Sequence, residues 1–243
     1  MRHRLPGVRA PEQGALYINT LEDIADDFDV FLLDAFGVLN IGETAIPGTR
    51  ERSETLKRAG KRVLVVSNAA SVPPTTLRDK YKRLGFDFAL DDIVTSRATL
   101  AAYVTGAEGV TWGAMLGPDQ IIGDLSALQI VMLEDDPQPY RDVGGFILIG
   151  SGQWTEARQS LLESALQHAP RRVLVANPDI VAPRETGFSV EPGHYAHRIA
   201  DATGVDPEFF GTPFAKIIAH AIERLGPVDK SRVVLVGDSI HPE

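Results

Sequence analysis

Five short runs of branched apolar residues recur along the chain, and each is continuous rather than alternating. They are VFLLD (30–34), RVLVVSN (62–68), GFILIG (145–150), RVLVAN (172–177) and RVVLVGD (232–238). Continuous apolar runs of this length are typical of parallel strands that are covered on both faces. The pattern therefore predicts at least five buried strands.

Helical patterns separate these runs, at residues 49–60, 73–85, 154–169 and 212–226. Thr155 is a predicted N-cap, and glycines end three of the four segments. Strands that alternate with helices predict an α/β fold with a Rossmann-like, doubly wound parallel sheet, whose ligand site lies at the carboxyl ends of the strands. The acidic segment EDDPQPYRD (134–142) is predicted to be a solvated loop.

Composition narrows the possible partners and the cellular location. The chain has 243 residues, 44% of them hydrophobic, which is enough for a large core with an inserted domain. A formal net charge of -9 argues against a nucleic-acid partner, and the absence of cysteine excludes disulfides and thiolate chemistry. The apolar runs are too short to cross a bilayer. We expect a cytoplasmic protein with no membrane partner, and a homo-oligomer is compatible with the sequence.

Polar side chains follow three of the predicted strands. Asp34 ends the first run, Ser67 and Asn68 end the second, and Asp238 follows the last. Parallel neighbouring strands would bring these side chains to one edge of the sheet. Two carboxylates that meet there repel each other, and a hard cation such as Mg²⁺ relieves that repulsion. The set predicts a metal and phosphate site.

Here the chain resembles the haloacid dehalogenase superfamily, and within it the class IIA phosphatases related to p-nitrophenyl phosphatases and sugar-phosphate phosphatases. The segments that carry the resemblance are LLDAFGVL, VVSN, FFGTPFAKIIAHAIERLG and VLVGDS, together with VANPDIVAPRETGFSVEPG (175–193). The resemblance implies a core domain of residues 1–105 and 201–243 and an inserted α/β cap of residues 106–200. Asn177 and Asp179 of the cap would shape the substrate.

The resemblance also implies a mechanism. Asp34 would be the nucleophile, and a carboxylate oxygen of Asp34, the backbone carbonyl of Phe36 and the side chain of Asp238 would hold Mg²⁺. Ser67, with backbone amides near Asn68, would bind the phosphoryl group of a small phosphorylated metabolite. The further acid of the last motif corresponds to Glu243, and the resemblance implies a core domain that is shortened at this end.

Two positions depart from the family pattern. Phosphatases of the superfamily usually have a second aspartate where this chain has Phe36, and a phenyl ring cannot transfer a proton. They also have a lysine where this chain has Thr212, which we interpret first as a helix N-cap and second as a phosphate contact. Lys216 lies one turn further and is the candidate replacement, although a helical wheel favours its pointing to solvent. Turnover could therefore be weak.

Three alternatives stay open. A haloacid dehalogenase that hydrolyses a carbon–halogen bond without metal would share the DAFG segment, but Asp238 favours the phosphatase. A protein that binds a phosphorylated ligand without useful turnover would explain the departures at Phe36 and Thr212. A GDS-type esterase is disfavoured because its blocks would overlap within residues 237–242. The sequence does not identify the substrate.

Overall fold

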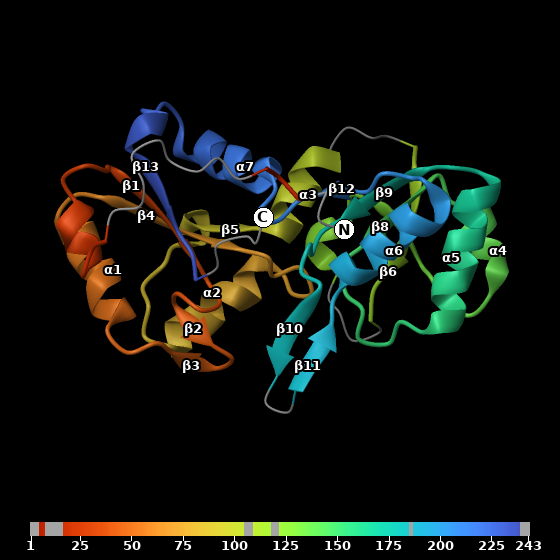
Figure 1. Ribbon diagram of the computed structural model, residues 1–243, viewed down its shortest axis with the longest axis horizontal. Coiled ribbons are helices and arrows are strands. Elements are labelled where there is room, and N and C mark those ends of the chain that lie inside the picture. Colours follow the sequence, from red (N-terminus) through yellow and green to blue (C-terminus); the bar gives the residue numbers. More distant parts are fainter. Residues whose placement is uncertain (1–4, 8–16, 105–108, 118–121, 185–186, 239–243) are drawn as a thin grey trace. The chain divides into compact units, whose positions relative to one another are not determined.

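The computed structural model of the protein describes residues 5–7, 17–104, 109–117, 122–184 and 187–238. The chain forms two compact units, one from residues 1–67, 75–94 and 218–243 and the other from residues 68–74 and 95–217. Each unit has its own parallel sheet (Figure 1). Within these described ranges, no helix is long and apolar enough to cross a membrane. The predicted limits of the cap, residues 106–200, stay a prediction.

The first unit is built on a four-stranded parallel sheet. Its strands, in spatial order, are β13 (Val233–Val236), β1 (Val30–Asp34), β4 (Arg62–Ser67) and β5 (Ile93–Thr95). All four of the residues Val30 to Leu33 are buried, because β1 lies between two neighbours and is covered on both faces. The continuous apolar pattern of three predicted strands is thereby explained.

Helices and a small hairpin surround this sheet. They are α1 (Thr49–Arg58), α2 (Pro74–Arg83) and α7 (Ala215–Leu225), with η2 (Leu21–Ile24), β2 (Asn40–Ile41), β3 (Thr44–Ala45), η3 (Leu90–Asp92) and η5 (Lys230–Arg232). The end of α7 is tied to the starts of two strands. Arg62 donates to the carbonyl of Leu225 at 2.6 Å, and Arg224 donates to the carbonyl of Ile93 at 3.0 Å. Both bonds satisfy carbonyls at element ends.

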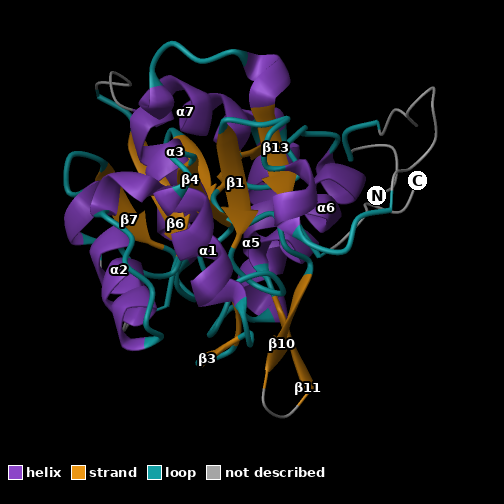
Figure 2. Ribbon diagram, turned by 90° about the vertical axis from the view of Figure 1, so that its left-hand side faces the viewer, coloured by secondary structure: helices purple, strands orange, loops and turns teal. Residues whose placement is uncertain are grey.

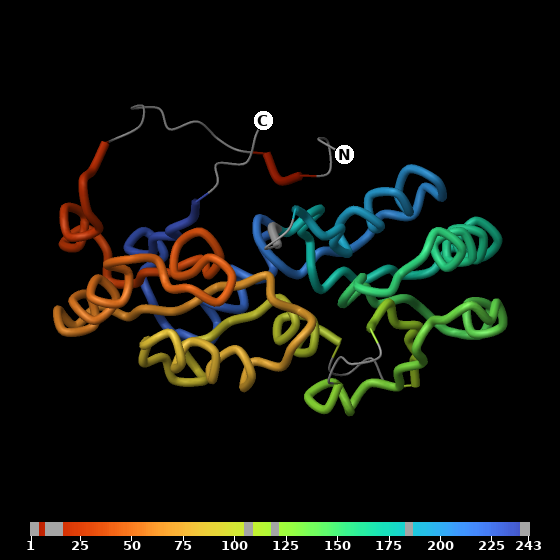
Figure 3. Tube along the Cα trace, turned by 90° about the horizontal axis from the view of Figure 1, so that it is seen from below, coloured from red at the N-terminus to blue at the C-terminus, as the bar shows by residue number. Residues whose placement is uncertain are grey.

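The second unit has a five-stranded parallel sheet. Its strands, in spatial order, are β12 (Glu208–Phe209), β9 (Arg172–Val175), β8 (Gly145–Leu148), β6 (Thr111–Met115) and β7 (Gln129–Met132). Its helices are α3 (Ser96–Val104), η4 (Gly123–Leu125), α4 (Pro137–Asp142), α5 (Glu156–His168) and α6 (Pro192–Thr203). Helices α5 and α6 pack against each other and run side by side in the green and blue parts of the chain (Figures 1 and 3).

Alternate residues of this sheet enter two separate cores. Phe146 and Leu148 pack with residues of α4, α5 and α6, whereas Ile147 packs on the opposite face with Leu100 and Val104 of α3. Helices on both faces of a parallel sheet are the doubly wound arrangement. The predicted fold class, a Rossmann-like α/β core with an inserted second α/β region, is confirmed.

A two-stranded antiparallel hairpin completes the second unit. Strand β10 (Val181–Arg184) pairs with β11 (Gly187–Val190), and Figure 2 shows the two strands alongside each other. It follows the Asn177 to Asp179 segment directly and ends at the start of α6. The position of its base is therefore linked to that segment through the chain.

Two local predictions were wrong. Residues 134–142 contain helix α4 rather than only a loop, because Asp136 caps it by accepting from the Gln138 amide at 2.9 Å and Pro137 occupies the first turn. The last helix, α7, begins at Ala215, so Thr212 is not its N-cap. The predicted N-cap Thr155 is confirmed, since its hydroxyl accepts from the Arg158 amide at 3.2 Å.

Candidate active site

Three strand ends of the first unit meet at one edge of its sheet. Asp34 pairs in register with Val66, the residue before Ser67, and Leu33 pairs with Val236, two residues before Asp238. Parallel pairing therefore brings Asp34, Ser67 and Asp238 to the same carboxyl edge, as the sequence predicted. The chemical roles of these residues are not settled by their placement and stay predictions.

The turn after β1 is compact and well bonded. One oxygen of the Asp34 carboxylate accepts from the Ala35 amide at 2.6 Å, and the Ala35 carbonyl accepts from the amides of Leu39 and Asn40 at 2.9 and 3.1 Å. The Gly37 amide donates to the Asn40 carbonyl at 3.0 Å. The ring of Phe36 is 38% exposed, so this position faces solvent rather than the core.

Asp238 lies directly against this turn. Gly37 has a φ of +82°, and a Cβ atom built there would lie 2.0 Å from Oδ2 and 2.8 Å from Cβ of Asp238. The glycine is required twice, once by the left-handed backbone and once by the close approach of the carboxylate. The geometry thus places a second carboxylate on the turn that follows Asp34.

Tyr81 is a site residue that the sequence did not reveal. It lies on α2, is 1% exposed, and forms a side-chain hydrogen bond with Ser67. Burial and the nearby charge of Asp34 raise the pKa of the Tyr81 phenol far above its usual value, so it stays neutral. Tyr81 lies four residues after Leu77, which is also buried, so both lie on one face of α2. This spacing indicates packing, and for that reason it did not identify Tyr81 as a polar contact of the site.

In the second unit, the side chain of Asn68 is fully hydrogen bonded. Its amide nitrogen donates to Oδ1 of Asp179 at 2.8 Å and to the carbonyl of Thr212 at 3.1 Å. Its carbonyl oxygen accepts from the backbone amide and the hydroxyl of Thr212 at 2.7 and 3.2 Å. A side-chain amide has two donor and two acceptor positions, and all four are used. Asn68 can offer a phosphoryl group only its backbone amide.

The predicted cap residues Asn177 and Asp179 belong to one polar network. Asn177 accepts from the Asp179 amide at 2.9 Å and donates to Glu191 at 3.2 Å, and Ser189 also donates to Glu191. Burial raises the pKa of the Asp179 carboxyl to about 6. The hydrogen bond from Asn68 lowers this pKa, and the negative charge of Glu191 makes a smaller contribution that raises it. Sequence reasoning missed Glu191, which no motif marks.

Lys216 is engaged within the second unit. Its ammonium group lies 2.7 Å from a carboxylate oxygen of Glu208 and 4.3 Å from the ring centroids of Tyr103 and Phe210. Burial raises the pKa of Glu208, but hydrogen bonds from Lys216 and Arg172 outweigh it and the pKa is lowered, which favours the ion pair. A catalytic role for Lys216 would have to compete with these contacts.

The described residues leave the proposed metal site with oxygen donors from two carboxylates and a backbone carbonyl. No group of three or more His, Cys, Asp or Glu side chains within the described ranges is placed to hold a metal ion. Asp34, Asp238 and the carbonyl of Phe36 are hard oxygen ligands, which suit Mg²⁺ with water completing its shell. Glu243, the further predicted ligand, lies outside the described residues.

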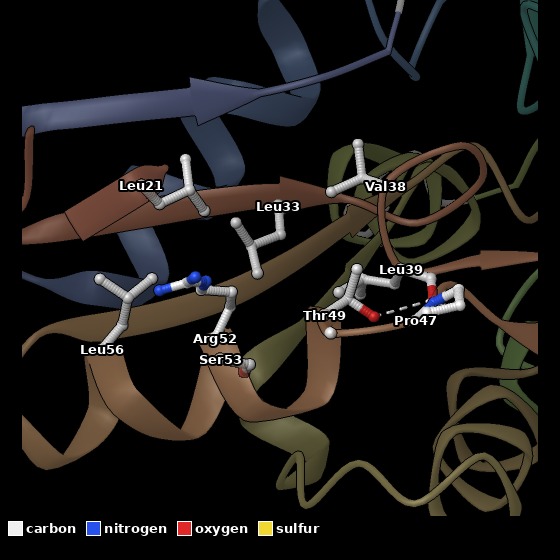
Figure 4. A pocket seen from close by; sticks show the side chains of 10 residues that line it. Leu21, Leu33, Val38, Leu39, Pro47, Thr49, Arg52, Ser53 and Leu56 are labelled. Carbon is white, nitrogen blue, oxygen red and sulfur yellow. Dashed lines mark hydrogen bonds between the residues drawn. The ribbon is translucent and has the colours of Figure 1, made fainter. Parts of the chain in front are cut away.

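An apolar cavity of about 270 Å³ lies in the first unit beside α1 (Figure 4). Four leucines, Leu21, Leu33, Leu39 and Leu56, are among the residues that line it, and Thr49 in its wall donates to the carbonyl of Ile46 at 2.7 Å. Asp34, Ser67 and Asp238 do not line it. This cavity is therefore separate from the residues predicted to bind metal, and its lining has no carboxylate or histidine.

Comparisons with known proteins agree with this picture. A family model described as haloacid dehalogenase-like hydrolase matches residues 31–130. An acid sugar phosphatase from Staphylococcus aureus is 26% identical over 211 residues, which cover 87% of this chain and 79% of the relative.

Solved structures show the same fold. A possible sugar phosphatase of the HAD superfamily from Cytophaga hutchinsonii has a TM-score of 0.79 at 25% identity, over 93% of this chain and 83% of the other. A 4-nitrophenylphosphatase from Thermotoga maritima has a TM-score of 0.75 at 24% identity, over 90% and 81%. These likenesses extend over both units of the chain.

The double requirement at Gly37 can be tested by comparing Gly37→Ala with Gly60→Ala. Gly60 has nearly the same φ, +79°, but nothing lies within 4 Å of the added Cβ. Gly60→Ala should cost about 1–2 kcal/mol of unfolding free energy, the price of a left-handed alanine. Gly37→Ala should cost at least about 1 kcal/mol more, because Asp238 must also move. Urea denaturation measures both, and equal costs would contradict the close approach.

The raised pKa of Asp179 predicts a pH-dependent difference between the wild type and Asp179→Asn. Because the folded-state pKa of about 6 exceeds the ordinary aspartate value of 3.8, the stabilising contribution is complete below pH 3.8 and is lost as the pH rises through 6. Up to about 3 kcal/mol of unfolding free energy is involved. Relative to Asp179→Asn, the wild type should lose stability between pH 4 and 7 in urea denaturation. A constant difference would refute the shift.

Proposed function

We propose that the chain, which is similar to haloacid dehalogenase-like hydrolases over residues 31–130, is a Mg²⁺-dependent phosphatase acting on a small phosphomonoester. The observation that carries this proposal is the meeting of Asp34, Ser67 and Asp238 at one sheet edge, with Asp238 against the turn after Asp34. Relatives named as sugar and nitrophenyl phosphatases support the reaction class.

Asp34 is the proposed nucleophile. Its carboxylate oxygen attacks phosphorus, the bond to the leaving oxygen breaks, and the resulting aspartyl phosphate is hydrolysed by water. The hydrogen bond from the Ala35 amide to one Asp34 oxygen fixes the orientation of the carboxylate, which directs the other oxygen to the substrate. Ser67, oriented by its hydrogen bond with Tyr81, and the backbone amide of Asn68 would bind the phosphoryl oxygens.

Asp34, Asp238 and the carbonyl of Phe36 would hold the metal ion, with Glu243 as a further predicted ligand. Phosphatases of this superfamily use a divalent metal ion, and the hard oxygen donors here favour Mg²⁺. When bound, the ion supplies positive charge that offsets the repulsion between the carboxylates and the phosphoryl oxygens. Because Gly37 has no side chain, the turn after Asp34 lies close to Asp238, so that the turn and Asp238 could contact the same ion.

Phe36 determines which substrates would suit this site. With no carboxyl group at this position, the leaving oxygen must take its proton from water, and water must attack the aspartyl phosphate without a base at position 36. Esters with acidic leaving groups, such as nitrophenyl phosphate, lose least from this. The same feature favours a second candidate function, a protein that binds a phosphorylated ligand with little turnover.

The main proposal is tested with a panel of phosphate esters, sugar phosphates included, and haloacids, assayed with Mg²⁺ and with a chelator. We expect Mg²⁺-dependent phosphate release, reduced by at least about 10³-fold in Asp34→Asn because the amide cannot attack phosphorus. Asp29→Asn, which changes the residue before the same strand and affects exposed ion pairs with Arg232 and Lys61, is the matched control. No metal-dependent release from any ester would defeat the proposal, and tight phosphate binding without turnover would favour the second candidate.

The role of position 36 is tested by Phe36→Asp. Supplying a proton donor should raise turnover of an alkyl phosphate on the order of 10-fold or more, with a smaller gain for nitrophenyl phosphate. Phe36→Asn is close in size to aspartate but cannot transfer a proton, so it controls for removal of the ring. Because Phe36 is 38% exposed, neither change removes a core side chain. Equal effects of both variants would argue against acid–base chemistry at this position.

A further inference from the structure

The backbone just after β4 is held at two points by side chains of the second unit. Asn68 is bonded on all sides by Asp179 and Thr212. Two residues later, the carbonyl of Ala70 accepts from the guanidinium of Arg97 at 2.9 Å. Arg97 is fully buried and is itself held by both oxygens of Asp124. The Asn68 contact includes one carboxyl group, that of Asp179, whereas the Ala70 contact is supported by the ion pair of Arg97 with Asp124.

The Asn68 hold is also sterically tight. A Cβ at Gly211 would lie 2.2 Å from Oδ1 of Asn68 and 2.6 Å from the ring of Pro178. A Cβ at Gly193 would lie 1.9 Å from the Pro178 carbonyl oxygen and 2.6 Å from that of Asp179. The backbone of the segment that contains Asp179 is thus enclosed between two glycines, which leaves it little room to move away from Asn68.

Among the described residues, the charged group that acts on Asp179 is Glu191, which raises the pKa of Asp179 by its negative charge. The neutral groups of Asn68 and Asn177 form hydrogen bonds with the Asp179 carboxyl and amide. An ionised carboxylate accepts a stronger hydrogen bond from an amide than a neutral acid does. The strength with which Asn68 is held therefore depends on the protonation of Asp179.

We propose that Asp179 is a positioning residue, whose ionised carboxylate holds Asn68 and thereby keeps the backbone after Ser67 in its phosphate-binding conformation. The proposal rests on the proposed phosphatase function and adds to it a control by protonation. It also assigns to the Asp179 side chain a contact within the protein rather than with the substrate. The raised pKa of Asp179 puts this control close to neutral pH.

The first test follows the Asn68 side-chain amide by NMR in the ¹⁵N-labelled full chain, with its signals identified by their loss in Asn68→Gln. Between pH 4.5 and 8, these signals should titrate in the wild type and not in Asp179→Asn. Removing the neighbouring charge by Glu191→Gln should lower the midpoint. Asp124→Asn, which removes the carboxylate behind the other hold, should leave the midpoint unchanged. A wild-type Asn68 amide that does not titrate would overturn the proposal.

The second test measures the affinity for inorganic phosphate by calorimetry at pH 7.5. Asp179→Ala should weaken binding about tenfold, and Asp179→Asn, which keeps an acceptor oxygen but not the charge, should weaken it less than Asp179→Ala does. Unchanged affinity in Asp179→Ala would overturn the proposal, and if that variant does not fold, the NMR result with Asp179→Asn decides. If no ester in the assay above releases phosphate, the proposed phosphatase function is wrong. The proposed role of Asp179 can still be tested in that case, since the Asn68 titration does not require turnover.

Discussion

The parallel pairing of β1 with β4 on one side and β13 on the other is the constraint on which the rest of the candidate site depends. Residues 30–34 are adjacent to residues 62–66 and 233–236, which are far away in the sequence. Hydrogen bonds of a parallel ladder fix this register, and the register alone decides that Asp34, Ser67 and Asp238 end at the same edge. A slip of one residue would turn Asp34 toward the opposite face of the sheet.

Gly37 shows how local and long-range requirements meet at that edge. Its left-handed backbone closes the turn after Asp34, and its missing side chain makes room for Asp238 from the other end of the described chain. Two negative charges are thereby brought close, which costs free energy unless a cation joins them. The fold contributes the stability that keeps the carboxylates in place, and the metal ion would lower the cost of their proximity.

Much of the architecture could be predicted from the sequence, because buried parallel strands have continuous apolar runs and four helices have clear boundaries. Strand β6 was not predicted because its sequence, TWGAM, has no branched apolar residues, and Gly113 within it is needed where Leu133 and Phe146 approach. Helix α4 was not predicted because its acidic, proline-containing sequence suggested a loop. The strand-end residues were predictable from their order along the chain, whereas Tyr81 and Glu191 depend on side-chain contacts that no spacing predicts.

The complete hydrogen bonding of Asn68 has a consequence for how sequences of this kind vary. An aspartate at position 68 would face the carboxylate of Asp179 with no proton between them, and an apolar residue would leave the amide of Thr212 without its partner. Positions 68 and 179, which are 111 residues apart, are therefore expected to change together or not at all. An asparagine directly after Ser67 would then indicate that the segment Asn177 to Asp179 is present to bind it. It would say less about which reaction takes place at Asp34 and Ser67.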